Sequence, residues 1–235
     1  MPNILLLDTA TEVCSVALYA NGGIAALRED LDCKSHIAVL TLMIEDCLKS
    51  IGMDYSALDA VAISGGPGSY TSLRTGASVA KGLCFALDIP LIAIDTLQSL
   101  AWGAQQTVDE FVIHIPMLDA RRNEVWLNAF DHNCQPLGTA QPLILEGDGL
   151  EQYLAQFGTS SKFILSGNGV LKIKDKSISN NAYVCSVKKN SSQFLGSFAV
   201  ENLYANLTED IVHYNPIYQK PPNITVSQQP NFTHI

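Results

Sequence analysis

A glycine-rich turn at residues 64–70 is the segment best suited to hold an anion. It follows an apolar run and precedes a helical pattern, and the backbone N–H groups at a helix N-terminus can bind an anion. The turn is not a Walker A loop, because no Gly-Lys-Ser/Thr follows, and not a dinucleotide fingerprint, because Thr71 replaces the third glycine. The turn also carries no lysine to complement a phosphate, so we favour a structural role for Gly66, Gly68 and Ser69.

Two aspartates, Asp8 and Asp119, each end an apolar run and could together hold a cation. With Thr9, the glycine turn and Gly167 they would line a nucleotide or anion cleft, which we predict to be degenerate. Aspartates at strand ends more often cap turns. Residues 8–10 also lack the glycine that would let a phosphate approach the first hairpin.

The histidines and cysteines do not form a metal motif in the sequence. The histidines show no i, i+4 pair, none adjoins a cysteine pair, and no C-x-x-C is present. We expect His36 to be an exposed first-turn residue and His114 to lie in the core. No histidine can be assigned to activate Ser69 as a nucleophile. We therefore predict no metal, no cofactor and no catalytic residue.

The elements that would position these residues form an α/β pattern. Apolar runs separated by turn residues predict an antiparallel meander over 4–7, 14–20 and 24–29. Further strands are expected at 58–64, 91–94, 111–118, 125–130 and 163–165, and helices at 35–51, 71–87, 96–104, 149–157 and 192–203. The two β-rich halves predict an N-terminal lobe at 1–105, a smaller second lobe at 106–218 and a partly mobile tail at 219–235.

The composition predicts a cytoplasmic protein that does not bind nucleic acid alone. Of its 235 residues, 47% are hydrophobic and 16% are charged, which is sufficient for a substantial core. The net charge is −9 and basic runs are short, whereas nucleic-acid affinity depends on Lys and Arg contacts to phosphate. The six cysteines are scattered, as is usual for a reducing compartment. No leader pattern is present, and no apolar run reaches the ~20 residues of a membrane span.

Five segments of the sequence resemble the TsaB (YeaZ) family. They are ILLLDTAT at 4–11, SGGPGSYTSLRTG at 64–76, IAIDTLQSL at 92–100, MLDARRNEVW at 117–126 and a looser PIYQK at 216–220. In the last of these, Lys220 replaces an arginine of the family pattern. The glycine turn, with the Leu73-Arg74-x-Gly76 that follows it, is the most specific part.

This resemblance implies an actin-like (ASKHA, ribonuclease H-like) fold with two lobes, each a mixed sheet with flanking helices. It also implies a role in threonylcarbamoylating the tRNA adenosine beside the anticodon, together with a TsaD-type catalytic paralog and a TsaE-type ATPase. A self-dimer is expected when the paralog is absent. The catalytic paralog carries two metal-binding histidines at positions where this chain has Thr96 and Leu100. The resemblance therefore implies a non-catalytic subunit.

The same resemblance implies a partner interface formed by the helices at 35–51 and 71–87. The first helix is apolar around much of its circumference, and the second carries small residues that allow close approach. The interface is expected to include Ile37, Leu40, Ile44, Arg74, Gly76, Val79, Ala80 and Leu83. The alternative is that many of these residues belong to the chain's own core.

Two enzymatic alternatives remain open from the sequence. An actin-like ATPase or kinase acting alone would use Asp8, the glycine turn and residues 166–169 to hold ATP across the cleft. A glycoprotease-like peptidase is less well supported, because neither a metal-binding pair nor a catalytic triad can be assigned.

Overall fold

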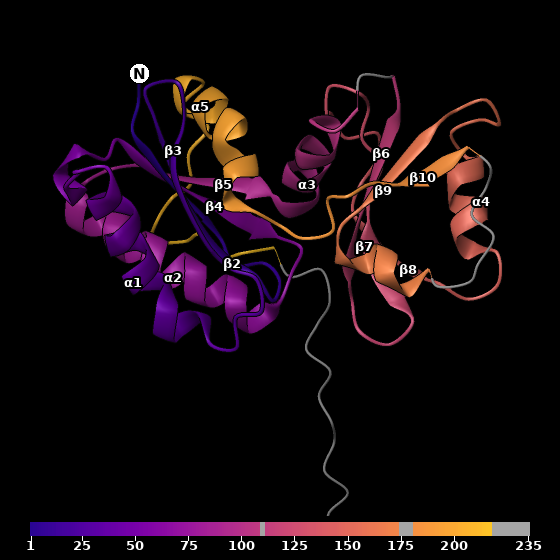
Figure 1. The fold of residues 1–235 in the computed structure, drawn as a ribbon, viewed down its shortest axis with the longest axis horizontal. Helices are drawn as coiled ribbons and strands as arrows, with labels where there is room; N and C mark the ends of the chain where they lie inside the picture. The colour runs from indigo at the N-terminus through magenta and orange to yellow at the C-terminus, as the bar shows by residue number, and fades with distance from the viewer. Residues whose placement is uncertain (109–110, 174–180, 218–235) are drawn as a thin grey trace, which may run out of the picture.

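The computed structural model describes residues 1–108, 111–173 and 181–217. These residues form two five-stranded sheets that lie side by side, with helices against their faces (Figure 1). Both sheets contain parallel and antiparallel pairs. The predicted two-lobed α/β fold class is therefore confirmed. The predicted tail at 219–235 lies outside the described residues.

The first sheet has the strand order β3-β2-β1-β4-β5, with β1 at its centre. Side chains of β1 alternate between two cores: Leu5 and Leu7 face α1 and α2, whereas Ile4 and Leu6 face α3 and α5. Burial on both faces explains why the apolar run is unbroken. The elements of this lobe are β1 Ile4–Asp8, β2 Cys14–Ala20, β3 Gly23–Asp30, α1 His36–Ser50, η1 Tyr55–Ala57, β4 Ala60–Gly66, α2 Tyr70–Leu87, β5 Leu91–Asp95 and α3 Thr96–Gln105.

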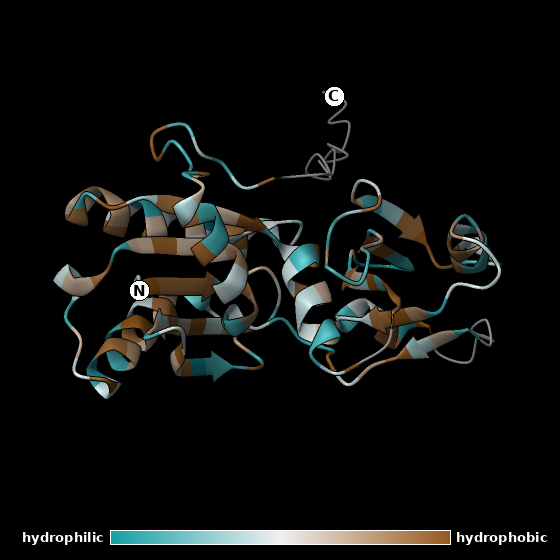
Figure 2. Ribbon diagram, turned by 90° about the horizontal axis from the view of Figure 1, so that it is seen from above, coloured by the Kyte–Doolittle hydropathy of each residue, from teal (hydrophilic) through white to brown (hydrophobic). Residues whose placement is uncertain are grey.

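The second sheet has the strand order β10-β9-β6-β7-β8 and packs one face on α4. Its other face meets α3, so that Leu118 and Phe130 share a core with Leu97 and Leu100. Hydrophobic strands accordingly lie inside both halves of the molecule (Figure 2). The elements are β6 Ile113–Asp119, β7 Glu124–Leu127, β8 Gln141–Ile144, α4 Gly149–Ala155, β9 Phe163–Ser166, η2 Asn168–Lys172 and β10 Ala182–Val184.

After β10 the chain returns to the first sheet through η3 Ser192–Leu195 and α5 Gly196–Tyr204. Leu195 and Phe198 bury the sheet face that carries Ile4 and Leu6. This path differs from the predicted second lobe at 106–218, because residues from about 190 onward pack on the first lobe. The reason is that this face of the first sheet is apolar and needs a cover.

The described helices are amphipathic or buried in the cores. The longest of them, α2, has 18 residues and exposes polar and small side chains along part of its length. Within the described residues, no helix combines the length and the hydropathy required to cross a lipid bilayer.

Candidate functional site

Asp8 ends β1 and is fully buried, with 0% of its surface exposed. Its Oδ1 accepts hydrogen bonds from the Ala10 N–H at 3.0 Å and from the Ser64 hydroxyl at 3.2 Å. Its Oδ2 has no partner among the described residues. Burial raises the pKa of the Asp8 carboxyl, and these hydrogen bonds offset only part of the rise. Asp8 therefore shapes the turn after β1 and is not presented to solvent.

Replacing the Asp8 carboxyl with an amide is expected to stabilise the protein at pH 7. A carboxyl with a raised folded-state pKa stabilises the fold in acid, and this contribution is lost as the pH rises through that pKa. Asp8→Asn keeps an oxygen for Ala10 and Ser64 but removes the charge. The free energy of unfolding should rise by on the order of 1 kcal/mol for each unit by which burial raises the pKa of Asp8. This increase should become smaller in acid. Urea unfolding at several pH values measures this change, with Asp54→Asn as control, because Asp54 is exposed and its side chain makes no capping hydrogen bond. A variant less stable at pH 7 would show that the carboxylate is stabilising.

The glycine turn at residues 64–70 packs inward, against the turn that follows β1. The Gly66 N–H donates to the Thr96 hydroxyl at 3.1 Å, and the Ser69 N–H donates to the Ala10 carbonyl at 2.7 Å. A β-carbon added to Gly68 would lie 2.5 Å from the Ala10 carbonyl oxygen, so no other residue fits there. Since two of its N–H groups are satisfied within the chain, the turn offers fewer donors to an anion.

Asp119 is the last residue of β6 and Gly167 directly follows β9, both in the second lobe. The Asp119 N–H donates to Asn168 Oδ1 at 2.9 Å, and its carboxylate forms an ion pair with Lys172. Asn168 Nδ2 also donates to Glu12 Oε2 at 2.9 Å, which connects these turns to the turn after β1. The structure therefore brings the turns of the two lobes together, but the Asp119 charge is neutralised within its own lobe.

Residues 190–192 cover the end of β1, a feature that the sequence analysis missed. The Ser192 N–H donates to Ser15 Oγ at 2.9 Å, and the two hydroxyl oxygens lie 2.8 Å apart. Asn190 is buried and lies near enough to Asp8 to lower the pKa of that carboxyl. The polar run at 190–192 was the available signal, but before a predicted helix such a run indicates only a cap. This segment helps to exclude solvent from Asp8.

The predicted interface residues lie on α1 and α2, which pack side by side on one face of the first sheet (Figure 1). They divide into a buried group (Leu40, Ile44, Gly76 and Ala80), a partly buried group (Val79 and Leu83) and an exposed group (Ile37 and Arg74). A β-carbon on Gly76 would lie 2.4 Å from Thr9 Oγ1, so this glycine serves packing inside the lobe. The buried group therefore belongs to the core rather than to the outer face of the helices.

Large apolar side chains nevertheless remain exposed on this helix pair. Ile37 is 76% exposed, Leu42 63% and Phe85 81%. Ile37 was predicted from the sequence for the interface, whereas Leu42 and Phe85 were not. Each of the two adjacent helices therefore exposes large apolar side chains, which form contact surfaces for other proteins where they are contiguous.

Comparisons with known proteins identify the family. Residues 30–175 match a family model described as TsaD, tRNA N6-adenosine threonylcarbamoyltransferase. The chain is 38% identical to the tRNA threonylcarbamoyladenosine biosynthesis protein TsaB of Haemophilus influenzae over 130 residues, 53% of this chain and about half (52%) of that protein's length. It is 32% identical to the TsaB protein of Escherichia coli over 168 residues, 71% of each chain. The chain belongs to the TsaB (YeaZ) family.

Solved structures are similar to this TsaB-family chain over nearly its whole length. YeaZ from Pseudomonas aeruginosa has a TM-score of 0.80 at 26% identity, covering 93% of this chain and 100% of that one. The activator of 2-hydroxyisocaproyl-CoA dehydratase from Clostridium difficile, solved with bound ADPNP, has a TM-score of 0.56 at 11% identity, covering 87% and 97%. The second likeness shows the fold alone. The fold is the two-lobed actin-like fold implied by the resemblance.

Thr96 and Leu100 occupy the positions where the TsaB resemblance implies histidines in the catalytic paralog, and both are fully buried. The Thr96 hydroxyl accepts the Gly66 N–H and so holds the glycine turn. Leu100 packs in the core shared by the two lobes, where a β-carbon on Gly167 would lie 2.6 Å from its Cδ2. Each side chain therefore has a structural role at its position.

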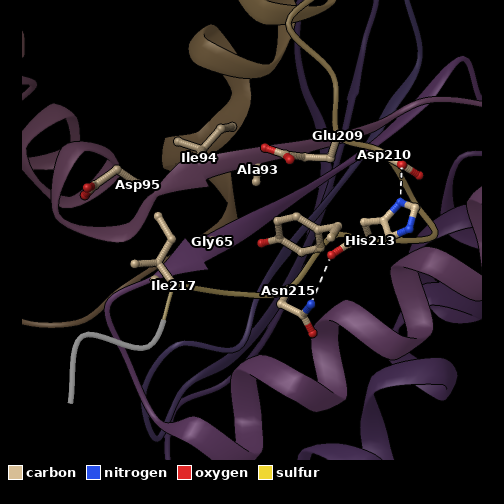
Figure 3. A pocket seen from close by; sticks show the side chains of 11 residues that line it. Gly65, Ala93, Ile94, Asp95, Glu209, Asp210, His213, Asn215 and Ile217 are labelled. Atoms are coloured by element: carbon tan, nitrogen blue, oxygen red, sulfur yellow. Dashed lines mark hydrogen bonds and ion pairs between the residues drawn. The ribbon is translucent and has the colours of Figure 1, made fainter. Parts of the chain in front are cut away.

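A pocket of about 430 Å³ lies between the ends of β4 and β5 and the returning chain at 209–217 (Figure 3). Asp95, Glu209 and Asp210 contribute acidic side chains to its lining. Asp210 accepts a hydrogen bond from His213 Nδ1 at 2.6 Å, which lowers the pKa of Asp210. Because acidic groups repel phosphate, this pocket does not supply an anion site next to the glycine turn.

A group of possible metal ligands, Cys14, Cys33 and His36, also lies in the first lobe. Among the described residues it is the one group of three or more His, Cys, Asp or Glu side chains close enough to share an ion. The expectation that His36 is exposed was wrong, since it is only 8% exposed. Its ring turns inward because Nε2 bonds to the Val13 carbonyl.

Proposed function

We propose that this chain is a non-catalytic partner of a TsaD-type threonylcarbamoyltransferase, acting in the formation of tRNA threonylcarbamoyladenosine next to the anticodon. The observation that carries the proposal is the 32% identity to E. coli TsaB over 71% of both chains. That relative is named for its part in tRNA threonylcarbamoyladenosine biosynthesis. The match of residues 30–175 to the TsaD model supports a paralogous catalytic partner.

The burial and internal contacts of the cleft residues support a non-catalytic role. Asp8 is buried under residues 190–192, and Thr96 and Leu100 serve the packing between the lobes. An ATPase or kinase of this fold would need Asp8 and the glycine turn to face a nucleotide. Both instead make contacts within the chain. The ATPase and peptidase alternatives therefore gain no support from the geometry.

The exposed side chains of α1 and α2 support an interface with the partner. Ile37, Leu42 and Phe85 would pack against the equivalent helices of the catalytic subunit, or of a second copy when that subunit is absent. A TsaE-type ATPase would act on the assembled pair. The net charge of −9 supports tRNA binding by the partner rather than by this chain. All six cysteines are free thiols, so the proposal extends to a reducing, cytoplasmic location.

Reconstitution of the modification reaction tests the proposal. The TsaD-type and TsaE-type proteins from the same genome are incubated with unmodified tRNA, with and without this chain. Threonylcarbamoyladenosine per tRNA, measured by mass spectrometry, is expected to rise at least ~10-fold when the chain is present, which corresponds to about 1.4 kcal/mol of activation free energy. The chain alone should neither modify tRNA nor hydrolyse ATP. Full modification without the chain, or turnover by the chain alone, would overturn the proposal.

A further inference from the structure

Cys14, Cys33 and His36 converge at the N-terminus of α1. Their two sulfurs and a ring nitrogen lie within 4.8 Å of one another, and all three residues are buried. Cys14 begins β2, Cys33 lies in the turn after β3, and His36 is the first residue of α1. Cys33 and His36 are only three residues apart in the chain, whereas Cys14 comes from a separate strand, so the group of three is brought together by the fold.

The backbone holds each of these side chains in place. His36 Nε2 lies 3.1 Å from the Val13 carbonyl oxygen. Because a carbonyl only accepts hydrogen bonds, Nε2 carries the proton and Nδ1 keeps its lone pair. Metal-binding histidines usually have this arrangement, with the second ring nitrogen donating to a carbonyl or carboxylate. The Cys33 N–H donates to the Glu12 carbonyl at 2.8 Å, and Cys14 is paired with Asp30 in the sheet.

We propose that Cys14, Cys33 and His36 bind a thiophilic divalent ion of the Zn²⁺ class. Zn–S bonds of ~2.3 Å place two sulfurs of a tetrahedral site about 3.8 Å apart. This separation falls within the 4.8 Å that bounds the distances among the three ligand atoms. Three protein ligands leave a fourth position for water. The two thiols lose their protons to solvent on binding, and no redox step is involved.

The ion would cross-link β2, the turn after β3 and the first turn of α1. This connection matters because α1 otherwise begins without a side-chain cap: Ser35, at the N-cap position, makes no capping hydrogen bond. An ion that binds the folded but not the unfolded chain would raise the free energy of unfolding by an amount that grows with the logarithm of its concentration relative to Kd. His36 immediately precedes Ile37, which is exposed and lies in the proposed partner interface. The ion would therefore fix the first turn of α1, the helix that carries Ile37.

Titration with Co²⁺ and Zn²⁺ tests the site in the full chain, kept reduced with a phosphine and freed of metal with a chelator that is then removed. One Co²⁺ per chain should bind, with a thiolate-to-cobalt charge-transfer band that Zn²⁺ abolishes, and Zn²⁺ should raise the Tm. Cys14→Ser, Cys33→Ser and His36→Gln should each weaken binding more than ~100-fold, since loss of an outer-shell partner alone typically costs 10–100-fold.

Cys84→Ser is the matched control, because Cys84 is a buried thiol of the same core cluster but is not one of the ligands. It should bind Co²⁺ like the wild type. No thiolate band in the reduced wild type, or equal loss of the band in Cys84→Ser, would overturn the proposal. A reduced chain that takes up no metal but forms a Cys14–Cys33 disulfide in air would also overturn it. If a serine variant fails to fold by circular dichroism, His36→Gln, at the 8% exposed helix start, decides the outcome.

Discussion

Replacing Ile37 or Phe85 with glutamate is expected to disrupt binding to the catalytic partner and leave the isolated chain folded. Ile37 is 76% exposed and Phe85 is 81% exposed, so neither side chain contributes much to the core. Surface substitutions of this kind usually change the free energy of unfolding by no more than ~0.5 kcal/mol. Loss of a large apolar side chain at the centre of an interface typically reduces the binding free energy by about 2 kcal/mol or more. Each variant should therefore weaken association more than ~30-fold.

Isothermal titration calorimetry of each variant with the TsaD-type protein of the same genome measures this loss, and the Tm of the isolated variant checks its fold. Leu207→Glu is the matched control, because Leu207 is also exposed, at 64%, but follows α5 on the opposite face of the first sheet. It should bind like the wild type. Wild-type affinity in Ile37→Glu and Phe85→Glu would contradict the α1–α2 interface. A loss confined to Leu207→Glu would instead assign the interface to the α5 side.

Helices and central strands were predictable because they depend on local periodicity. The predicted helices at 35–51 and 71–87 are observed as α1 His36–Ser50 and α2 Tyr70–Leu87. The short strands β8 and β10 were not predicted, because they are largely exposed and show no apolar alternation. The return of η3 and α5 to the first sheet was also missed. That path is decided by non-local packing on Ile4 and Leu6, which sequence spacing does not encode.

The candidate interface was only partly predictable for a related reason. Helical periodicity indicates which residues share a side of α1, but not which of its apolar sides faces the sheet. Leu40 and Ile44 therefore proved to be core residues, whereas Leu42 remains exposed. His36 was misjudged in the same way, because its burial depends on the distant carbonyl of Val13. The residues of the cleft turns were identified, but their closure by residues 190–192 required the three-dimensional structure.

Gly167→Ala is expected to be strongly destabilising, although it adds only one methyl group. Gly167 has φ 87° and ψ 172°, a region that essentially only glycine adopts. An added β-carbon would lie 2.3 Å from the Met117 carbonyl oxygen and 2.6 Å from Leu100 Cδ2. The carbonyl belongs to β6, which is hydrogen-bonded in the sheet and cannot move aside freely. Backbone strain and overpacking cost about 1–3 kcal/mol each, so we expect a loss of roughly 3–5 kcal/mol.

The variant Gly52→Ala is the control that separates the cost of backbone strain from the cost of overpacking. Gly52 also has a positive φ, of 66°, but an added β-carbon meets no atom within 4 Å, so only the left-handed strain of about 1–2 kcal/mol applies. Urea unfolding of both variants at pH 7 gives the difference. The close packing of Gly167 against Met117 and Leu100 predicts that Gly167→Ala costs at least ~2 kcal/mol more than Gly52→Ala. Separation of the lobes would relieve only the Leu100 contact, because Met117 lies in the same lobe as Gly167. Equal costs for the two variants would contradict the tight packing of Gly167 against the β6 backbone.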